Sequence, residues 1–219
     1  MKVPVKYALS ALLGFLIGAT ALFAFFRLSD STSVKKFIVP DYSEARSGIS
    51  ISSNNSNLVD LALDVSEYIK NKDYESLSSV IHPSLGVVFI PYSTVDFSSN
   101  KRFSASEVAS FGASDTTYVW GIMDGTGDPI EMTPSEYFAR FVFNVDYTQA
   151  STIGVNRIVQ SGNALENVTD EFPNSKFIDL YYPGTAEYNN LDWSTLRLVF
   201  EEFDGEYMLT AIIHSEWTV

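Results

Sequence analysis

The C-terminal part of the sequence contains two long strand patterns, at 194–203 and 206–217, separated only by Asp204-Gly205. Asp-Gly favours a two-residue hairpin turn, which would place Phe203 opposite Glu206 and Thr195 opposite His214. Strict alternation then assigns an apolar set to one face: Leu196, Leu198, Phe200, Leu209, Ala211 and Ile213. It assigns a half-polar set to the other face: Thr195, Arg197, Glu201, Thr210, Ile212 and His214. We expect the apolar face to pack in the core.

The sequence before this hairpin carries helix signals first and strand signals later. Apolar residues recur at helical spacing over 58–70, with Asn57 as a capping residue, and Asp73 can cap a second helix that ends before His82-Pro83. Further signals are a buried strand at 86–90, capping boxes at 104–107 and 133–136, and strands at 117–123 and 129–132. This order predicts an α+β domain, in which a long helix packs on a curved, mainly antiparallel sheet.

The segment from Tyr7 to Phe26 holds twenty uncharged, mostly apolar residues, enough to cross a bilayer as a helix. It is apolar all round, whereas a core helix of a small domain would keep a polar stripe. We expect a signal-anchor within residues 1–30; the alternative is a signal peptide cleaved near Ala21, which would give a secreted protein. Charges flanking the segment weakly favour an extracytoplasmic C-terminal part. Residues 31–56 are rich in Ser and Asn and predict a linker, which leaves 57–219 as one domain.

The predicted domain is acidic, with 8 Lys and Arg against 24 Asp and Glu from Leu58 onward, a formal charge of −16. It has no basic cluster to neutralise phosphates, which excludes nucleic acid as a partner. The chain contains no Cys, so disulfides, thiolate catalysis and cysteine zinc sites are excluded. His82 and His214 are its only histidines, which excludes a three-His metal centre. We expect no cofactor.

Two segments, LALDVSEYIKNKDYESLSSVIHP and LRLVFEEFDGEYMLTAIIHSEW, resemble the cone-shaped, cystatin-like α+β fold of the NTF2-like superfamily. Within it, HPSLGVVFIPY, YVWGIMDGTGDPI, IGVNRIVQSGN and DWSTLRLVFE, with the ending IIHSEWT, resemble an uncharacterised family of bacterial cell-envelope proteins. The resemblance spans Leu58 to Val219. It implies a fold and a location and brings no activity with it. In enzymes of the superfamily, it implies a pocket between the sheet and the long helix, with an Asp or His as general base.

The candidate catalytic residues are few. His214, with Asp192 or Glu216 as a carboxylate partner, would form a recurrent general-base arrangement. The alternation places His214 and Arg197 on the less apolar face, which counts against a pocket position unless a bulge shifts the register. His82 follows a helix and precedes Pro83, where an imidazole commonly closes the helix end. No Ser, Cys or Asp arrangement around it completes a catalytic unit.

The candidate ligand-binding residues are aromatic and amide side chains. Trp120, Tyr182 and Trp193 would line a groove for a glycan or peptide, although packing in the core or at its rim accounts equally well for them. Asn156 and Arg157 lie in a Gly- and Asn-containing region typical of binding loops. Asp124-Gly-Thr-Gly-Asp128 is a weak candidate for a calcium loop, because carboxylates at nearby positions can share one cation. It lacks the further ligands of an EF-hand, and a plain turn explains the glycines better.

These features favour a non-catalytic binding or interaction module, tethered to the membrane by its N-terminal helix and exposed outside the cytoplasm. Its partner would be a small molecule, a glycan or a protein. The alternative is a small pocket enzyme, a hydrolase or isomerase, using His214 with a nearby carboxylate. A homodimer built on the half-polar sheet face is a further possibility.

Overall fold

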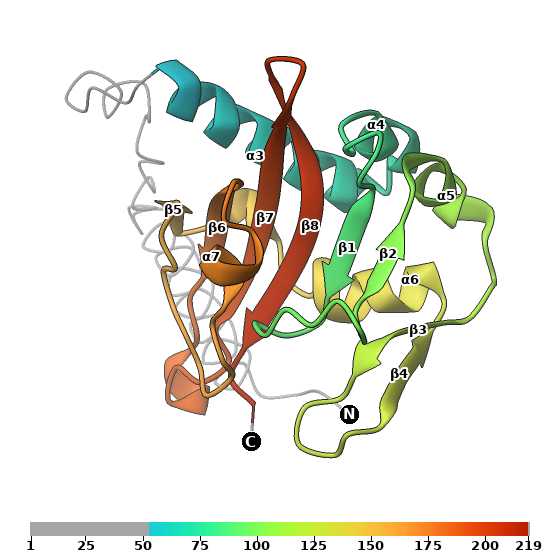
Figure 1. Cartoon of the computed structure of the whole chain (residues 1–219). Coiled ribbons are helices and arrows are strands. Elements are labelled where there is room, and N and C mark those ends of the chain that lie inside the picture. The colour runs from blue at the N-terminus through green and yellow to red at the C-terminus, as the bar shows by residue number, and fades with distance from the viewer. Residues whose placement is uncertain (1–52, 219) are drawn as a thin grey trace, which may run out of the picture. The chain divides into compact units, whose positions relative to one another are not determined.

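The computed structural model describes residues 53–218 (Figure 1). Contacts divide the chain after Ser50, and all described residues belong to the second unit, Ile51–Val219. The predicted anchor over 1–30 and the linker as far as residue 52 therefore lie outside the described residues. Within residues 53–218, no helix is both long enough and apolar enough to cross a bilayer.

The first described element is the long helix α3, Ser53–Asn71, which confirms the helix predicted over 58–70 and begins five residues earlier. Its buried face carries Leu58, Ala62, Val65 and Ile69, spaced at one or two helical turns. Asp73 caps the following helix α4, Tyr74–Ser79, as predicted, because its side chain accepts a hydrogen bond from the Ser76 amide at 3.0 Å. The helix signals in the sequence therefore predicted both α3 and α4 correctly.

The main sheet has six strands in the order β2-β1-β8-β7-β6-β5. The strands are β1 Val87–Ile90, β2 Lys101–Phe103, β5 Thr152–Val155, β6 Lys176–Tyr182, β7 Ser194–Phe203 and β8 Glu206–Glu216. All neighbours are antiparallel except β1 and β8, which are parallel. The α+β class is confirmed, with a mixed sheet whose centre is formed by the last strand of the domain.

Shorter elements complete the domain. A separate two-stranded sheet pairs β3, Tyr118–Ile122, with β4, Pro129–Met132, as the sequence predicted. Capping boxes begin α5, Ala105–Ala109, and α6, Pro134–Tyr137, again as predicted. The π-helix η2, Phe138–Val142, continues directly from α6. The remaining short elements are η1 Phe111–Ala113, η3 Tyr147–Gln149, α7 Val168–Glu171 and η4 Ala186–Tyr188.

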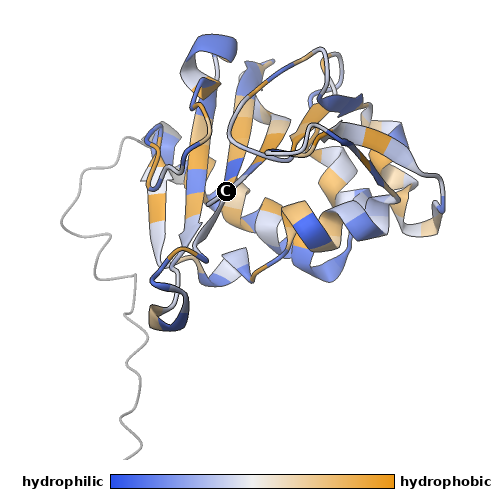
Figure 2. Cartoon of the chain, turned by 90° about the horizontal axis from the view of Figure 1, so that it is seen from below, coloured by the Kyte–Doolittle hydropathy of each residue, from blue (hydrophilic) through white to orange (hydrophobic). Residues whose placement is uncertain are grey.

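Both faces of the six-stranded sheet are buried. The helix face packs against α3, α6 and η2 through a large cluster rich in aromatic rings, including Phe89, Phe103, Trp120, Tyr137 and Phe141. The opposite face is covered by the chain around α7, where Val168 and Phe177 pack with side chains of β1, β7 and β8. Figure 1 shows α3 and α7 on opposite sides of the sheet, and Figure 2 shows the apolar residues along the strands and helices.

The C-terminal hairpin has the predicted turn but a different register along most of its length. Asp204 and Gly205 both have positive φ, 52° and 87°, and Phe203 pairs with Glu206 as predicted. Beyond the turn, however, Phe200 pairs with Leu209 while Val199 pairs with Ala211, which leaves Thr210 as an extra residue. This bulge is supported by a hydrogen bond from the Thr210 hydroxyl to a backbone carbonyl of β7 at 3.2 Å.

The bulge exchanges the faces of the second half of β8. The predicted pairing of Thr195 with His214 is wrong: His214 pairs with Leu196, and Thr195 pairs with Ser215. Ala211 and Ile213 pack in the cluster beneath α7 instead of the helix-side core. Ile212 and His214 instead face the helix side, where Ile212 joins the main core and the His214 ring contacts Phe141. The predicted assignment of His214 to an outer, half-polar face is therefore corrected.

Candidate functional site

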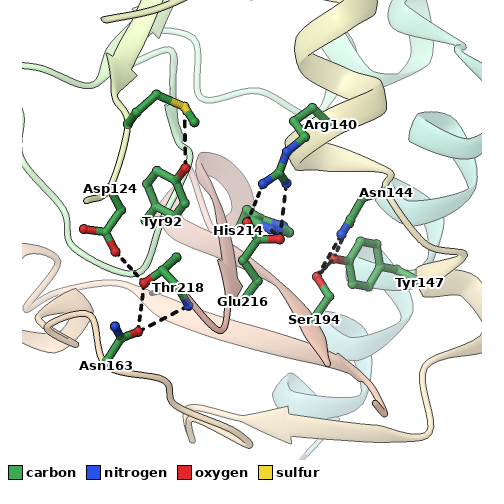
Figure 3. Close-up of polar contacts among 11 residues, drawn as sticks. Tyr92, Asp124, Arg140, Asn144, Tyr147, Asn163, Ser194, His214, Glu216 and Thr218 are labelled. Atoms are coloured by element: carbon green, nitrogen blue, oxygen red, sulfur yellow. Dashed lines mark hydrogen bonds and ion pairs between the residues drawn. The ribbon is translucent and has the colours of Figure 1, made fainter. Parts of the chain in front are cut away.

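A group of titratable side chains lies at the end of β8, where this strand meets η2 (Figure 3). The Arg140 guanidinium on η2 donates two hydrogen bonds to the Glu216 carboxylate on β8, Nη2 to Oε1 at 2.5 Å and Nη1 to Oε2 at 3.2 Å. His214, two residues before Glu216 on the same strand, places Nε2 3.2 Å from Glu216 Oε2. π-Helices are rare in proteins, and those that occur are frequently found at functional sites. Because Arg140 lies on the π-helix η2, this group is the first candidate for a functional site. We call it the His–Glu–Arg group.

Burial decides the charge state of this group. His214 is 1% exposed, and burial lowers its pKa more than the nearby Glu216 carboxylate raises it, so the imidazole is neutral at pH 7. Burial alone would raise the pKa of Glu216, but the contacts with His214 and Arg140 outweigh it and hold this pKa at about 2. The same contact with Glu216 raises the pKa of Arg140. Glu216 is therefore a permanent anion whose charge is balanced by Arg140.

The contact between His214 and Glu216 is a short approach of a neutral imidazole to a carboxylate. The two atoms are at ion-pair distance, yet within residues 53–218 neither His214 nitrogen has a partner with hydrogen-bond geometry. A buried imidazole without such partners is uncommon and costs free energy. The arrangement has the residue types of a general base with its carboxylate, but the base is sealed from solvent in this conformation.

A second polar group locks the neighbouring η3 to the start of β7. The Tyr147 hydroxyl lies at hydrogen-bond distance, 2.6 Å, from Ser194 Oγ and donates a hydrogen bond to Asn144 Oδ1 at 2.8 Å. Asn144 Nδ2 donates to Ser194 Oγ at 3.2 Å. Burial raises the pKa of Tyr147 well above its ordinary value. The phenol is therefore protonated at physiological pH, and this group holds two elements together beside the His–Glu–Arg group.

An open cleft of about 340 Å³ lies beside Tyr92. Its lining residues come from the loop after β1, the β3–β4 hairpin and the segment before α7: Pro91, Tyr92, Thr94, Asp96, Ser99, Asn100, Ile122, Met123, Asp124 and Ala164. The Tyr92 ring packs edge-on against Phe141, 5.7 Å between centroids, and its hydroxyl lies 3.7 Å from Met123 Sδ. Phe141 also contacts the His214 ring, so one aromatic pair separates the cleft from the His–Glu–Arg group.

Of the two predicted carboxylate partners of His214, the structure brings Glu216 to it and uses Asp192 elsewhere. Both Asp192 oxygens accept hydrogen bonds from Thr185, from the amide at 2.6 Å and the hydroxyl at 2.8 Å. The other predicted histidine, His82, closes a turn: its Nδ1 accepts hydrogen bonds from the amides of Ser84 and Leu85 at 3.2 and 3.0 Å. Its ring packs against Phe203, so its observed contacts are structural.

Arg197 lies on the opposite sheet face from His214 and is completely buried. Its Nη1 donates to Glu166 at 2.6 Å, and its Nε lies 3.5 Å from Oδ1 of Asp179, its cross-strand partner on β6. Asp179 is also fully buried and accepts a hydrogen bond from the Val159 amide at 2.8 Å. This group ties the segment around α7 to the sheet and occupies the face on which a homodimer was expected. Dimerisation itself stays a prediction.

The predicted ligand-binding aromatics are mostly interior residues. Trp120 is 0% exposed, stacks on Tyr137 with centroids 3.9 Å apart, and donates its indole N–H to a backbone carbonyl of β4. Trp193 is buried as well, whereas Tyr182 is half-buried against the main core. None of these three lines the cleft described above.

Asn156 and Arg157 follow strand β5. Asn156 adopts a positive φ of 50°, and its side chain accepts a hydrogen bond from the Phe177 amide at 2.9 Å, which gives it a turn-forming role. Arg157 is exposed. The two residues therefore share a turn rather than a cavity, and their participation in binding stays a prediction.

The Asp124–Asp128 loop is built as a turn. The Asp124 carboxylate accepts hydrogen bonds from the Gly125 amide at 3.0 Å and from the Thr218 hydroxyl. The Asp128 carbonyl accepts from the Met123 amide at 2.7 Å, which closes the hairpin between β3 and β4. In the part of the chain that the structure describes, no three His, Asp or Glu side chains gather in a way that could hold a metal ion. The weak calcium-loop hypothesis gains no support from this geometry.

Sequence reasoning missed Arg140, Asp179, Glu166 and the cleft. Arg140 and Glu216 are 76 residues apart, and no local pattern indicates their pairing. Asp179 does carry a signal, because it stands alone at the centre of the otherwise apolar strand pattern FIDLYY. A lone carboxylate in such a strand requires a buried partner, and Arg197 directly opposite supplies it.

No protein-family model and no curated protein sequence matches this chain. Among solved structures, the chain is similar to that of AusH from Aspergillus nidulans, with 13% sequence identity and a TM-score of 0.27, over 73% of this chain and 83% of that chain. A likeness at this level carries no argument about activity or ligand. The domain is an α+β domain with a six-stranded mixed sheet, and its own geometry must supply any functional conclusion.

Proposed function

We propose that this protein is a binding module of the NTF2-like type, tethered to the membrane by the N-terminal helix and presented outside the cytoplasm, with the cleft beside Tyr92 as its ligand site. One observation carries the proposal: a ligand-sized cleft is open, while the neighbouring groups that could perform acid–base chemistry are buried or already paired. Ligand sites are concave and begin at about 300 Å³. The cleft therefore suits a small ligand.

The cleft has the mixed lining expected of such a site. Pro91, Ile122 and Met123 supply apolar surface, Tyr92 supplies an aromatic ring, and Asp96, Asn100 and Asp124 supply hydrogen-bonding groups. The sheet strands position this lining, because Tyr92 lies two residues after the end of β1 and Asp124 lies two residues after the end of β3. A long helix packed against a sheet that ends in a long hairpin supports the NTF2-like assignment.

Binding is tested on the domain from Ile51, which contains the complete core, by amide NMR with a diverse library of small fragments. We expect hits that shift the amides around Tyr92 and Asp124, and Ile122→Asp should abolish them while leaving the thermal midpoint unchanged, because Ile122 is 44% exposed. Hits that never involve the cleft would contradict the assigned site. Val119→Asp is a matched control, since Val119 is equally exposed on the same strand and does not line the cleft.

The tether is tested separately with the full chain. We expect the protein to partition with the membrane fraction, to resist carbonate extraction, and to lose its domain when external protease is added to intact cells. Deleting residues 1–30 should release the protein from the membrane fraction. Protection of the domain from external protease would contradict the extracytoplasmic location.

A second candidate function, a small hydrolase or isomerase, is favoured by the 3.2 Å approach of Glu216 to His214 and by the adjoining π-helix. Its reaction would require the Tyr92–Phe141 pair to move, so that substrate reaches the imidazole. Turnover of an ester or ketone panel by the purified domain, lost in His214→Gln and retained in His82→Ala, would establish it. Turnover that persists in His214→Gln would eliminate His214 as its base.

A further inference from the structure

The charged groups that line the cleft are all of one sign. Asp96 and Asp124 contribute carboxylates, and none of its described lining residues is Lys, Arg or His. The cleft also belongs to a domain with a formal charge of −16 from Leu58 onward. A concave site lined by one sign of charge concentrates ligands of the opposite sign and repels those of the same sign. An anionic ligand is therefore disfavoured twice, by the lining and by the whole domain.

Both carboxylates are held in place by hydrogen bonds. Asp124 accepts from the Gly125 amide and the Thr218 hydroxyl, and Asn163 in turn accepts from the same hydroxyl at 2.8 Å. Asp96 accepts from Ser98 and Ser99, and these contacts lower its pKa. A carboxylate offers about four acceptor positions, so the two hydrogen bonds at Asp124 leave it capacity for a ligand donor. The donors that fix them do not cancel their charge, because all are neutral groups.

Besides the polar side chains of Thr94, Ser99 and Asn100, the lining has an apolar part that suits the hydrocarbon portion of a cation. Pro91, Ile122, Met123 and Ala164 offer no strong hydrogen-bonding side chains. The Tyr92 side chain is held by its ring contact with Phe141 and by its hydroxyl contact with Met123 Sδ. An aromatic face attracts an ammonium group within about 6 Å of its centroid. Carboxylates beside aliphatic and aromatic walls therefore match a molecule with a positively charged end and a short hydrocarbon body.

We propose that the cleft binds a small organic cation of the alkylamine or diamine class, with an ammonium group at Asp124 and the hydrocarbon part against Tyr92, Ile122 and Met123. This inference rests on the proposed function, because it names the ligand class of the same cleft. A neutral polar ligand of equal length would satisfy the apolar walls and lose the charge interaction. An anion of equal length would be rejected.

The test compares three probes with the same five-carbon chain: cadaverine, 1,5-pentanediol and glutarate. Each is titrated into the domain from Ile51 at physiological salt, with affinity and site followed by amide NMR. We expect cadaverine to bind at least about tenfold more tightly than the diol, with shifts around Tyr92 and Asp124, and glutarate not to bind. Asp124→Asn should weaken cadaverine binding about tenfold, because the amide keeps an acceptor for Thr218 and removes the charge.

Asp128→Asn is the matched control, since Asp128 lies in the same hairpin loop, carries the same charge and does not line the cleft. It should change cadaverine affinity by less than about twofold, because an exposed charge outside the site acts only through screened, long-range attraction. Tyr92→Leu, which removes the ring but keeps an apolar side chain, should weaken cadaverine binding more than diol binding. Thermal midpoints of all three variants establish that each is folded.

The outcomes separate the ligand class from the binding function. Equal loss of affinity in the Asp124 and Asp128 variants would show diffuse attraction and overturn the proposal. Equal binding of diol and cadaverine in the cleft would overturn the cationic class but leave the binding module standing. If no fragment of any charge binds in the cleft, the proposed function fails as well.

Discussion

Replacing Arg197 by Met should be among the most damaging single substitutions in the domain. Met fills a similar volume without charge, so the loss isolates the electrostatic role of the guanidinium. Glu166 is 14% exposed in its side chain and can turn toward water, but Asp179 is 0% exposed and would remain as a buried carboxylate without a cation. Breaking a buried ion pair in this way costs about 3–5 kcal/mol. For a domain of this size, that corresponds to a fall of about 6–20 °C in Tm.

The pH dependence of the loss gives the prediction a second readout. Burial raises the pKa of Asp179 and Arg197 opposes it, so removing Arg197 raises this pKa further. A carboxyl whose folded pKa is raised favours the folded state below its unfolded pKa, about 3.9, and this advantage is lost as the pH rises through the folded value. The deficit of Arg197→Met relative to the wild type should therefore be larger at pH 8 than at pH 5.

Urea denaturation of the domain from Ile51, followed by far-UV circular dichroism, measures the effect. Arg157→Met is the matched control, because Arg157 is exposed and its loss should change the free energy of unfolding by no more than about 0.5 kcal/mol. Adding Asp179→Asn to Arg197→Met should recover most of the loss, since Asn removes the stranded charge and can still accept from Val159. An Arg197→Met variant as stable as the Arg157 control would refute the reasoning.

Three further predictions follow from other contacts. Contacts with His214 and Arg140 hold the pKa of Glu216 at about 2, so ionised Glu216 stabilises the folded state above about pH 4.3, and this stabilisation is lost as the pH falls toward 2. In Glu216→Gln, Tm should therefore decrease less between about pH 4.3 and about pH 2 than in the wild type. His82→Ala should cost about 1–3 kcal/mol in urea denaturation, because two amides lose their acceptor, and His82→Asn should cost less because its side-chain oxygen can replace Nδ1. Gly86→Ala should lower the free energy of unfolding by at least about 2 kcal/mol, since a Cβ there would lie 2.3 Å from the Phe103 carbonyl oxygen. Gly205 has a similar positive φ with open space around it, so Gly205→Ala should cost only about 1 kcal/mol. Equal losses in the two variants would contradict the steric argument.

Local signals predicted the local elements correctly. Asp73, the two capping boxes and the Asp204-Gly205 turn each act through hydrogen bonds or dihedral angles within a few residues, and each is found where the sequence placed it. The parallel pairing of β1 with β8 was not predicted, because it joins segments more than a hundred residues apart. The predicted pairing of β7 with β8 beyond Thr210 was also wrong. Both faces of this hairpin are buried and carry apolar side chains, so the sequence alternation does not reveal the position of a bulge.

The same limit applies to the candidate site. His214 and Glu216 are two residues apart on one strand, so their proximity follows from the sequence once their face is known. Their partner Arg140 lies on a π-helix, whose extra residue per turn no spacing rule indicated. The cleft depends on three loops that meet only in the folded domain. The sequence therefore identifies individual polar residues within apolar strand patterns, but only the tertiary structure shows which of them lie together.

The position of β8 in the sheet has a consequence for how the domain reaches its folded state. Among the strands that the structure describes, β8 is synthesised last and yet lies between β1 and β7, and it carries His214 and Glu216. Until it leaves the ribosome, β1–β2 and β5–β7 are two separate pieces with exposed apolar edges, so the sheet must be completed after the rest of the domain is made. A chain shortened before Glu206 would therefore lack β8, the strand that joins these two pieces. It would be a substrate for proteases rather than a smaller version of the same domain.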